Sequence, residues 1–443
     1  MSTDHQIIVV GGGFAGVTAA RDLSQLGYRV VVLEARNRLG GRTHRRRFKD
    51  TDVEVELGGG WFAGEMQRFA HREITRYGLK YKPDPPVETF GHLLGGQRRE
   101  QPFPVTWEEA VDFERFGIHL LKAALTVDPA MPADLQPLKA FDVTWEEFVA
   151  PLGLPDGLRD LVDAWALDAC GGRATEDASA INHLWQTAQF GHSLVRWHTF
   201  IDQQLEGGTR ALLEAIIGDC NADVRLGTPV TEVEQQGGQV RVMTAEGEVL
   251  AAAGAVIAIP VNCWPNIAFS PRLNEDKVRG AALRPGTRGV KVYALVEDAP
   301  AGFMGYGNLD AGCGLTVVNG QGEVDGAQLI FGLSPAGRRE GIEDAFDPFD
   351  IELVQRAMSA YIPGAHVIAT DAEDWNVEPF SNGSWSAYRI GQMEFLGGMR
   401  RPEGRLVFAG SDIARGFMTW IDGAIESGTY AAAELNRIVT ADR

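Results

Sequence analysis

Several features that would point to other classes of protein are missing from this 443-residue chain. It has four cysteines and no Cys-x-x-Cys pair, so neither a disulfide framework nor a zinc site is predicted. No apolar run approaches the ~18 residues that a membrane span requires, and no charged-then-apolar leader precedes the first strand. The formal net charge of −19 disfavours nucleic acid and anionic membranes as partners. These absences predict a cytoplasmic protein with no metal centre and a small-molecule partner.

The remaining composition is ordinary, because 44% of the residues are hydrophobic and 23% are charged. The length allows two or three domains and a large core. No Ser/His/Asp or Cys/His arrangement is recognisable, so the chemistry is not expected to depend on a side-chain nucleophile.

A glycine-rich turn near the start of the chain carries the strongest pattern. Residues 7–10 form an apolar run that leads into Gly11-Gly12-Gly13-Phe14-Ala15-Gly16, then helical spacing begins, and a second apolar run ends at Glu34. Gly11 permits the tight turn, Gly13 lets the backbone approach a pyrophosphate, and Gly16 allows close packing of helix on strand. The helix N-terminus offers N–H groups to phosphates, and Glu34 can accept hydrogen bonds from a ribose. This arrangement predicts a dinucleotide site without identifying the dinucleotide.

Two further glycine motifs follow, Leu39-Gly40-Gly41-Arg42 and Leu57-Gly58-Gly59-Gly60-Trp61. Three consecutive glycines suit a place where the backbone passes against something flat. The glycine turn, the strand-end glutamate and these two motifs together resemble the flavin-dependent amine oxidases. The resemblance implies that the bound dinucleotide is FAD and that Arg42 contacts its pyrophosphate.

The resemblance extends to the end of the chain, where a strand delivers Ala409-Gly410-Ser411-Asp412 and a helix begins near Ile421. Asp412 is expected to face a ribityl or phosphate-side hydroxyl, and the helix N-terminus to direct N–H groups at the flavin O2 atom. Ser384 stands where some members carry a cysteine bonded to the flavin, which implies non-covalent FAD. The predicted FAD-binding residues are Gly11, Gly13, Phe14, Ala15, Gly16, Glu34, Ala35, Arg36, Gly41, Arg42, Gly58, Gly59, Gly60, Trp61, Val230, Gly410, Asp412, Trp420, Ile421 and Ala424.

Lys291, Trp385 and Trp420 are the predicted catalytic residues. Lys291 lies in a strand predicted over residues 289–296. One interpretation is a surface strand in which the side chain of Lys291 is exposed to solvent. The resemblance favours another, because an amine-oxidase lysine at this place holds a water against the flavin N5 atom. Trp385 and Trp420 correspond to the family positions that flank the substrate nitrogen as an aromatic cage, with core packing as the alternative.

Asp168 and Trp61 are the predicted substrate contacts. Cys263-Trp264, residues 409–412 and the segment at 389–392 resemble the nicotine and 6-hydroxynicotine oxidase branch, which oxidises a cyclic secondary amine. Asp168 falls where that branch carries a substrate-contacting asparagine, so a more basic or dicationic amine is expected; a helix-surface acid is the alternative. The implied reaction transfers hydride from the carbon beside the amine nitrogen to flavin N5, and O2 reoxidises the flavin to give imine and H2O2.

Two other classes of protein stay open. One is a different FAD oxidoreductase, such as an L-amino-acid oxidase, a polyamine oxidase or a desaturase. An amino-acid oxidase needs an arginine for the carboxylate, whereas this chain has Gly60-Trp61 at the family's position. The other is a non-enzymatic flavoprotein, which retention of Lys291 and both cage tryptophans disfavours. Amine and O2 are the expected partners, and a homodimer is left open.

The predicted fold class is α/β, with a discontinuous Rossmann-like FAD-binding domain and an α+β substrate domain. Helical spacing dominates residues 107–204, and strands are predicted over 224–233, 239–244 and 249–259. The FAD-binding domain is assigned to residues 1–85, 206–290 and 396–443. The substrate domain, with a mixed or antiparallel sheet and a helical insertion, is assigned to residues 86–205 and 291–395.

Overall fold

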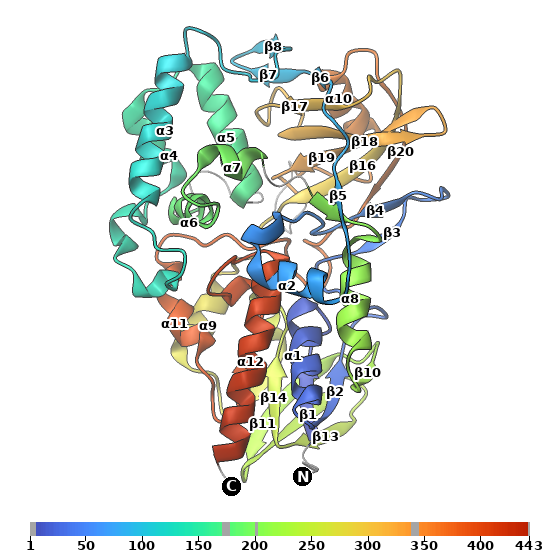
Figure 1. Ribbon diagram of the computed structural model, residues 1–443, viewed down its shortest axis with the longest axis vertical. Helices are drawn as coiled ribbons and strands as arrows, with labels where there is room; N and C mark the ends of the chain where they lie inside the picture. The colour runs from blue at the N-terminus through green and yellow to red at the C-terminus, as the bar shows by residue number, and fades with distance from the viewer. Residues whose placement is uncertain (1–5, 171–177, 200–202, 338–344, 442–443) are drawn as a thin grey trace.

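The computed structural model describes residues 6–170, 178–199, 203–337 and 345–441. Figure 1 shows an elongated molecule. Its lower part contains a parallel sheet with the first and last helices, α1 and α12, beside it. Its upper part divides into a group of helices on one side and a twisted sheet on the other.

A five-stranded parallel sheet forms the centre of the lower part. In β1, Ile7 and Val9 pack among helices, whereas Ile8 and Val10 belong to the cluster on the opposite face. Because both faces are covered, β1 is continuously apolar instead of alternating. The strands, in spatial order, are β10 (Asp223–Arg225), β2 (Arg29–Leu33), β1 (Gln6–Val10), β14 (Gly254–Ile257) and β21 (Leu406–Phe408).

Helices cover one face of the parallel sheet and a second sheet covers the other. The helices on this side are α1 (Phe14–Gln25), α2 (Arg68–Arg76), α8 (Gly208–Gly218) and α12 (Ile421–Ala441). The covering sheet contains, in spatial order, β13 (Val249–Ala252), β12 (Gln239–Thr244), β11 (Val230–Gln236) and β15 (Ala268–Ser270).

Two predicted strands were wrong in extent, because the chain changes sheets within them. The strand predicted over 224–233 is divided between β10 and β11, with Gly227 at φ 62° in the connection. The strand predicted over 249–259 is divided between β13 and β14, which belong to different sheets. Alternation of side chains alone cannot show such a transfer, because both pieces have strand periodicity.

The upper part contains a six-stranded mixed sheet and a group of helices (Figure 1). The strands, in spatial order, are β20 (His366–Ala372), β16 (Val290–Glu297), β19 (Ala327–Ser334), β18 (Val317–Val324), β17 (Phe303–Tyr306) and β6 (Thr89–Phe90). Helix α10 (Ile351–Tyr361) packs against this sheet. The predicted helical insertion is confirmed as α3 (Ala110–Ala124), α4 (Trp145–Val149), α5 (Asp156–Cys170), α6 (Ile181–Gln189) and α7 (Leu194–Thr199). Two-stranded pairs complete the strands: β3 (Arg45–Arg47) with β4 (Glu54–Glu56), β5 (Tyr81–Pro83) with β9 (Gln203–Leu205), and β7 (His92–Leu94) with β8 (Gln97–Arg99).

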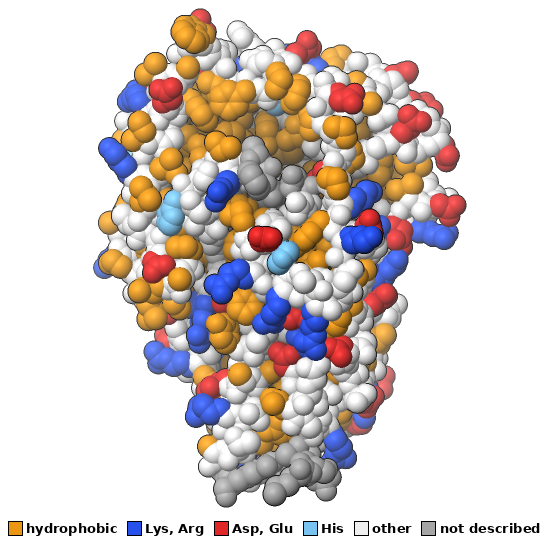
Figure 2. All heavy atoms as spheres, viewed as in Figure 1, with side chains coloured by type: hydrophobic (Ala, Val, Ile, Leu, Met, Phe, Trp, Pro, Cys, Tyr) orange, Lys and Arg blue, Asp and Glu red, His pale blue; other side chains and the backbone are white. Residues whose placement is uncertain are grey.

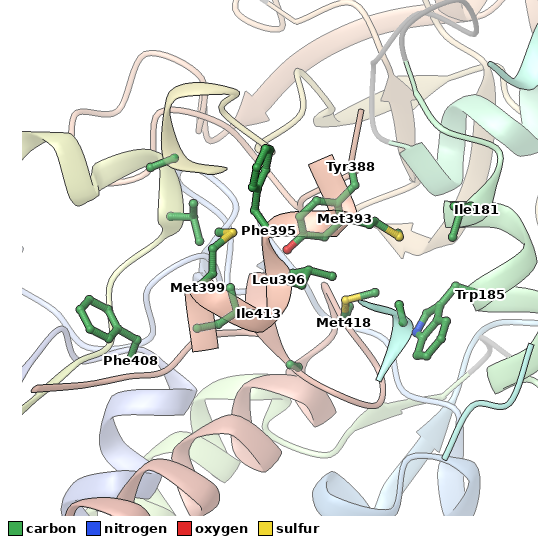
Figure 3. Close-up of a cluster of buried hydrophobic side chains, with 14 of the residues drawn as sticks. Ile181, Trp185, Tyr388, Met393, Phe395, Leu396, Met399, Phe408, Ile413 and Met418 are labelled. Carbon is green, nitrogen blue, oxygen red and sulfur yellow. The ribbon is translucent and has the colours of Figure 1, made fainter. Parts of the chain in front are cut away.

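A buried apolar cluster joins the helical group to the lower part (Figure 3). Ile181 and Trp185 enter it from α6, and Phe408 from β21. Between them lie Leu396 and Met399 of α11 (Leu396–Arg400), which packs against α9 (Glu275–Ala282). The cluster is continuous across the predicted boundary between the domains, and the domain division itself stays a prediction. Within the described ranges, no helix combines the length and the hydrophobicity that crossing a bilayer requires.

Candidate active site

One cavity of about 900 Å³ connects the glycine turn in the lower part to the space below the upper sheet. Its volume is near the upper limit of ordinary cofactor and ligand sites. It is lined by every predicted FAD-binding residue except Gly16 and Asp412, and also by Lys291 and Trp385. Residues far apart in the sequence therefore meet around one space, which is a prerequisite for a shared site.

The glycine turn is shaped for a close backbone approach. Gly11 has φ 104°, and a Cβ on it would lie 2.5 Å from the Ala258 carbonyl oxygen. A Cβ on Gly16 would lie 1.9 Å from the Gly11 carbonyl oxygen, so Gly16 serves packing and does not line the cavity. Gly13 precedes the first turn of α1, which no side chain of the described residues caps. The N–H groups of this turn can therefore donate hydrogen bonds to a phosphate.

Glu34 stands at the end of β2 with its carboxylate fixed by the backbone. Its Oε2 atom accepts the Gly12 N–H at 2.7 Å, and Oε1 accepts the Arg36 N–H at 2.9 Å. Each carboxylate oxygen has a further lone pair, so Glu34, which lines the cavity, can still accept a ribose hydroxyl. Arg36 is held by Glu378 and by the Ser381 hydroxyl at 2.7 Å.

Asp412 is paired with Arg42 at the edge of the cavity. Its carboxylate accepts Arg42 Nη2 at 2.6 Å, the Ser386 hydroxyl at 3.0 Å and the Val261 N–H at 3.1 Å. It is buried and does not line the cavity, because the guanidinium of Arg42 lies in front of it. Arg42 also donates to the Ser384 carbonyl oxygen at 2.9 Å. Asp412 therefore positions the cationic side chain that faces the cavity, and its predicted contact with a hydroxyl of the cofactor stays a prediction.

Lys291 is buried and faces the cavity, so the interpretation as a surface lysine is wrong. Its Nζ donates to the carbonyl oxygens of Gly58 at 2.7 Å and Glu56 at 3.1 Å. Burial lowers the pKa of Lys291 to about 7, against the opposing effect of Glu56 and Asp84. Near neutral pH both the charged and the neutral form of this amine are therefore populated, whereas an ordinary lysine is almost entirely charged.

Trp61 connects Lys291 to an acidic residue that the sequence did not single out. The Lys291 Nζ lies 3.9 Å from the centroid of the Trp61 ring, a cation–π distance. The Trp61 Nε1 donates to Asp84 Oδ2 at 2.6 Å, and Asp84 Oδ1 accepts Gln204 Nε2 at 2.7 Å. The indole is thereby fixed in the wall of the cavity with its face toward the lysine.

Trp385 and Trp420 line the same cavity from different segments. Gly289, just before β16, makes room for Trp385, since a Cβ there would lie 2.6 Å from its ring. Trp420 packs near Phe190 with ring centroids 5.9 Å apart. Its Nε1 is buried with no acceptor in the described part of the chain.

The N-terminus of α12 also borders the cavity, through Ile421 and Ala424. Asp422 in this first turn is turned away, because its Oδ1 accepts the N–H groups of Phe69 and Ala70 at 2.7 and 2.8 Å. Burial raises the pKa of Asp422 to about 6. The residues present thus fit FAD, with phosphate donors at one end of the cavity and a helix N-terminus and tryptophans at the other.

Sequence reasoning missed several side chains in the upper part of the cavity. Asp84 lies in a Pro-rich extended segment, and Gln186 lies on a helix recognised only by its apolar spacing. Asp168 is in the last turn of α5, and its side chain falls outside the described residues. The other unpredicted residues here are Trp165, Trp197, Met304, Tyr306, Asn319, Phe331 and Leu333.

Comparisons with known proteins agree with this geometry. Residues 14–436 match the family described as flavin containing amine oxidoreductase. The chain is 32% identical over 429 residues to (S)-6-hydroxynicotine oxidase of Paenarthrobacter nicotinovorans, covering 96% of this chain and 98% of the relative. It is 32% identical over 445 residues to pseudooxynicotine dehydrogenase of a Pseudomonas species, covering 96% and 85%.

A similar solved structure is putrescine oxidase bound to putrescine, at 21% sequence identity and a TM-score of 0.84. The alignment covers 98% of this chain and 99% of that chain. At this identity the likeness concerns the fold, and the predicted α/β fold class is confirmed.

Proposed function

The chain belongs to the family of flavin containing amine oxidoreductases and is an FAD-dependent amine oxidase; we propose that it oxidises a cyclic or secondary amine of the nicotine type. The observation that supports amine oxidation on FAD is the continuous cavity, which reaches from the N-terminus of α1, without a side-chain cap, to Lys291, Trp385 and Trp420. FAD, when bound, supplies the acceptor for the hydride.

The chain's own residues then bind, orient and exclude water. The first turn of α1 and the guanidinium of Arg42 hold the phosphates at the lower end. Trp385 and Trp420 present aromatic faces between which a small amine is steered. Lys291, held by two carbonyl oxygens and with a pKa of about 7, can hold or release a proton beside the reacting centre.

The substrate class rests on the relatives and on the lining of the upper part. (S)-6-hydroxynicotine oxidase and pseudooxynicotine dehydrogenase carry names of nicotine-type compounds, and each aligns with nearly the whole chain. Aromatic side chains dominate the upper lining, with Trp165 and Trp197 from the helices and Tyr306 and Phe331 from the sheet. Such walls suit a compact heterocyclic amine better than a long polyamine with several ammonium groups.

An L-amino-acid oxidase is a less suitable alternative. Among the described residues that line the cavity, the arginines are Arg36 and Arg42. Both belong to the dinucleotide end, and both are engaged, Arg36 by Glu378 and Arg42 by Asp412. As far as the described residues line it, the upper part therefore contains no guanidinium to clamp a substrate carboxylate.

A stopped-flow screen of flavin reduction tests the proposal. The holoenzyme is mixed without oxygen with primary, cyclic secondary and polyamine substrates at equal concentration, and flavin bleaching is recorded. Cyclic secondary amines should reduce the flavin fastest. Preferential reduction by an amino acid or a polyamine would reject the proposed substrate class, and no reduction by any amine would reject amine oxidation itself.

We also propose O2 as the acceptor and H2O2 as its product. The reduced enzyme is mixed with oxygenated buffer, and flavin reoxidation and peroxide formation are measured together. Rapid reoxidation with one peroxide per flavin supports the proposal. Reoxidation far slower than turnover with an artificial acceptor would assign the enzyme to the dehydrogenases, the description that the Pseudomonas relative carries.

Non-covalent FAD is a third part of the proposal. Ser384 occupies the place of the cysteine that bonds the flavin in some members, and its hydroxyl lies 2.8 Å from the Thr287 hydroxyl. Acid precipitation should leave the yellow cofactor in the supernatant, and flavin retained in the pellet would contradict non-covalent binding.

We also propose a cytoplasmic location, since Cys220, Cys263 and Cys313 are free thiols.

A further inference from the structure

Asn319 faces the cavity from β18, within the upper sheet. It pairs in register with Met304 of β17 on one side and with Phe331 of β19 on the other. These three side chains line the cavity on one face of the sheet, together with Lys291, Tyr306, Val317 and Leu333. Figure 2 shows hydrophobic side chains gathered between the helical group and the upper sheet. In such surroundings an amide recognises a polar substrate atom selectively, because leaving either group unpaired is costly.

A chain of hydrogen bonds reaches Asn319 from the protein side. Asp84 Oδ1 accepts Gln204 Nε2 at 2.7 Å, and the same nitrogen donates to Gln321 Oε1 at 3.3 Å. Gln321 Nε2 in turn donates to Asn319 Oδ1 at 2.7 Å. Neither glutamine lines the cavity, so both act on Asn319 from outside the space in which a substrate would lie.

The carboxylate of Asp84 fixes the direction of this chain. A carboxylate accepts hydrogen bonds, so Gln204 has to turn its NH2 group toward Asp84. The same NH2 group meets the oxygen of the Gln321 amide, which leaves the Gln321 NH2 group for the oxygen of Asn319. The Asn319 NH2 group therefore points away from Gln321. It donates to the Met304 sulfur, a weak acceptor, at 3.2 Å, and no acceptor among the described residues takes its second N–H.

We propose that Asn319 is a specificity-determining residue, which donates a hydrogen bond to an acceptor atom of the substrate such as a ring nitrogen. This role rests on the proposed oxidation of a compact amine and adds a second recognised atom to it. In the sheet, β19 separates β18 from β16, which carries Lys291 (Figure 1). Neighbouring strands are ~4.8 Å apart, so Asn319 lies roughly 10 Å across the sheet from the strand of Lys291. The acceptor atom therefore belongs to the part of the substrate remote from the reacting amine.

Amines that differ in one acceptor atom test the proposal. The holoenzyme is mixed without oxygen with phenylpyrrolidine, or with the pyridylpyrrolidines in which a nitrogen replaces each ring CH in turn. Dissociation constants follow from the concentration dependence of flavin reduction. At least one pyridyl isomer should bind about tenfold more tightly than the phenyl compound, the scale of one neutral hydrogen bond. For an amine that does not reduce the flavin, the flavin difference spectrum gives the dissociation constant, so failure of the proposed reaction is distinguishable from failure of this role.

Asn319→Asp removes the donor and keeps an oxygen that accepts from Gln321. The preference for the best pyridyl isomer over the phenyl compound should fall from about tenfold to parity or below. Expressing the result as this ratio cancels any general change in affinity for a cationic amine. A wild type without a pyridyl preference, or a preference that Asn319→Asp retains, would overturn the proposal.

Gln321→Glu tests the role without changing the lining of the cavity. It places a carboxylate oxygen beside Asn319 Oδ1, so the Asn319 amide should turn and present its oxygen to the substrate. The pyridyl preference should be lost, while the phenyl compound binds as in the wild type. Gln97→Glu, at an exposed position on β8, is the matched control and should keep the preference. Circular dichroism and flavin content check folding, and a preference that Gln321→Glu retains would overturn the fixed direction of the amide.

Discussion

The lower and upper parts of the cavity are built in different ways. In the lower part, the glycine turn is made of groups close in sequence, since Gly11, Gly13 and the first turn of α1 lie within a few residues and act through the backbone. In the upper part, side chains contact groups that are distant in sequence. Lys291, for example, donates to the carbonyl oxygen of Gly58, 233 residues earlier. Backbone sites with fixed spacing leave a readable pattern, whereas sites assembled by the tertiary fold do not.

The largest expected effects come from replacing two glycines of the lower part, one that serves packing and one that faces the pyrophosphate. Gly16→Ala places a Cβ 1.9 Å from the Gly11 carbonyl oxygen, so the turn has to shift. We expect a loss of about 3 kcal/mol or more in the free energy of unfolding of the apoprotein, together with loss of FAD. Urea unfolding of the apoprotein and flavin content after purification measure the two quantities.

Gly13→Ala is the matched variant. Its Cβ would lie 3.7 Å from Gly41 Cα, an ordinary contact, and Gly13 has φ −77°, which alanine adopts without strain. The apoprotein should therefore keep wild-type stability, while the FAD dissociation constant rises at least about tenfold because the backbone cannot approach the pyrophosphate. Equal stability losses in both variants would show that the two glycines have one structural role.

Lys291→Met tests the upper part at its reacting end. Methionine keeps the length of the side chain and removes the amine, so FAD should stay bound. We expect flavin reduction or its reoxidation to slow by about 100-fold, the scale of a lost proton-transfer group. Stopped-flow measurement of both half-reactions decides this, and unchanged kinetics in both would remove Lys291 from the chemistry.

The same substitution has a pH-dependent effect on stability. An unfolded lysine keeps its proton up to about pH 10.5, whereas folded Lys291 loses it above about pH 7, so between these values the unfolded chain binds more protons. Wild-type stability should therefore rise with pH across this window, and burying the charged form costs most below pH 7. The stability of Lys291→Met relative to wild type should be highest at pH 6 and fall toward pH 10, by a few kcal/mol at most. Urea unfolding at pH 6, 8 and 9.5 measures the difference, and a pH-independent difference would mean that Lys291 is not buried as a titrating amine.

The site residues that could be predicted from the sequence also differ between the lower and upper parts of the cavity. The glycine turn and Glu34 could be placed from spacing, because a strand–turn–helix has few geometries, whereas Arg42 was implied only by the resemblance to the amine oxidases. Asp412 was predicted to contact a hydroxyl of the cofactor and its bond to Arg42 was not predicted, since a strand-end aspartate gives no indication of whether it faces ligand or protein. Asp84 and Gln186 were missed, because helical or Pro-rich spacing does not show which distant segments a residue will meet.

Trp420→Ala addresses the predicted aromatic cage with a smaller expected effect. Removing the ring should lower kcat/KM for the best amine about tenfold, the scale of one well-placed aromatic contact with an amine, while Trp420→Phe retains most of the activity. Trp107→Ala is the control, because that ring is 90% exposed and does not line the cavity. Steady-state kinetics, with flavin content measured in parallel, would show the drop in kcat/KM. Equal activity of Trp420→Ala and wild type would assign Trp420 to packing.

Asp84→Asn should give the smallest effect and is the most specific to the upper part. The amide keeps an acceptor oxygen for the Trp61 Nε1, now 2.6 Å from the Asp84 carboxylate, but removes the negative charge. The charges that act on Lys291 are those of Asp84 and Glu56, and both raise the pKa that burial lowers to about 7. Without the charge of Asp84 the pKa of Lys291 should fall further. The pH profile of anaerobic flavin reduction, and a pH titration of the flavin absorption spectrum, should shift to lower pH in parallel. Asp223→Asn, at a 55% exposed side chain on β10, should shift neither. If Asp84→Asn left both curves in place, Glu56 alone would oppose the burial of the amine, and the Trp61–Asp84 contact would serve only to hold the wall of the cavity.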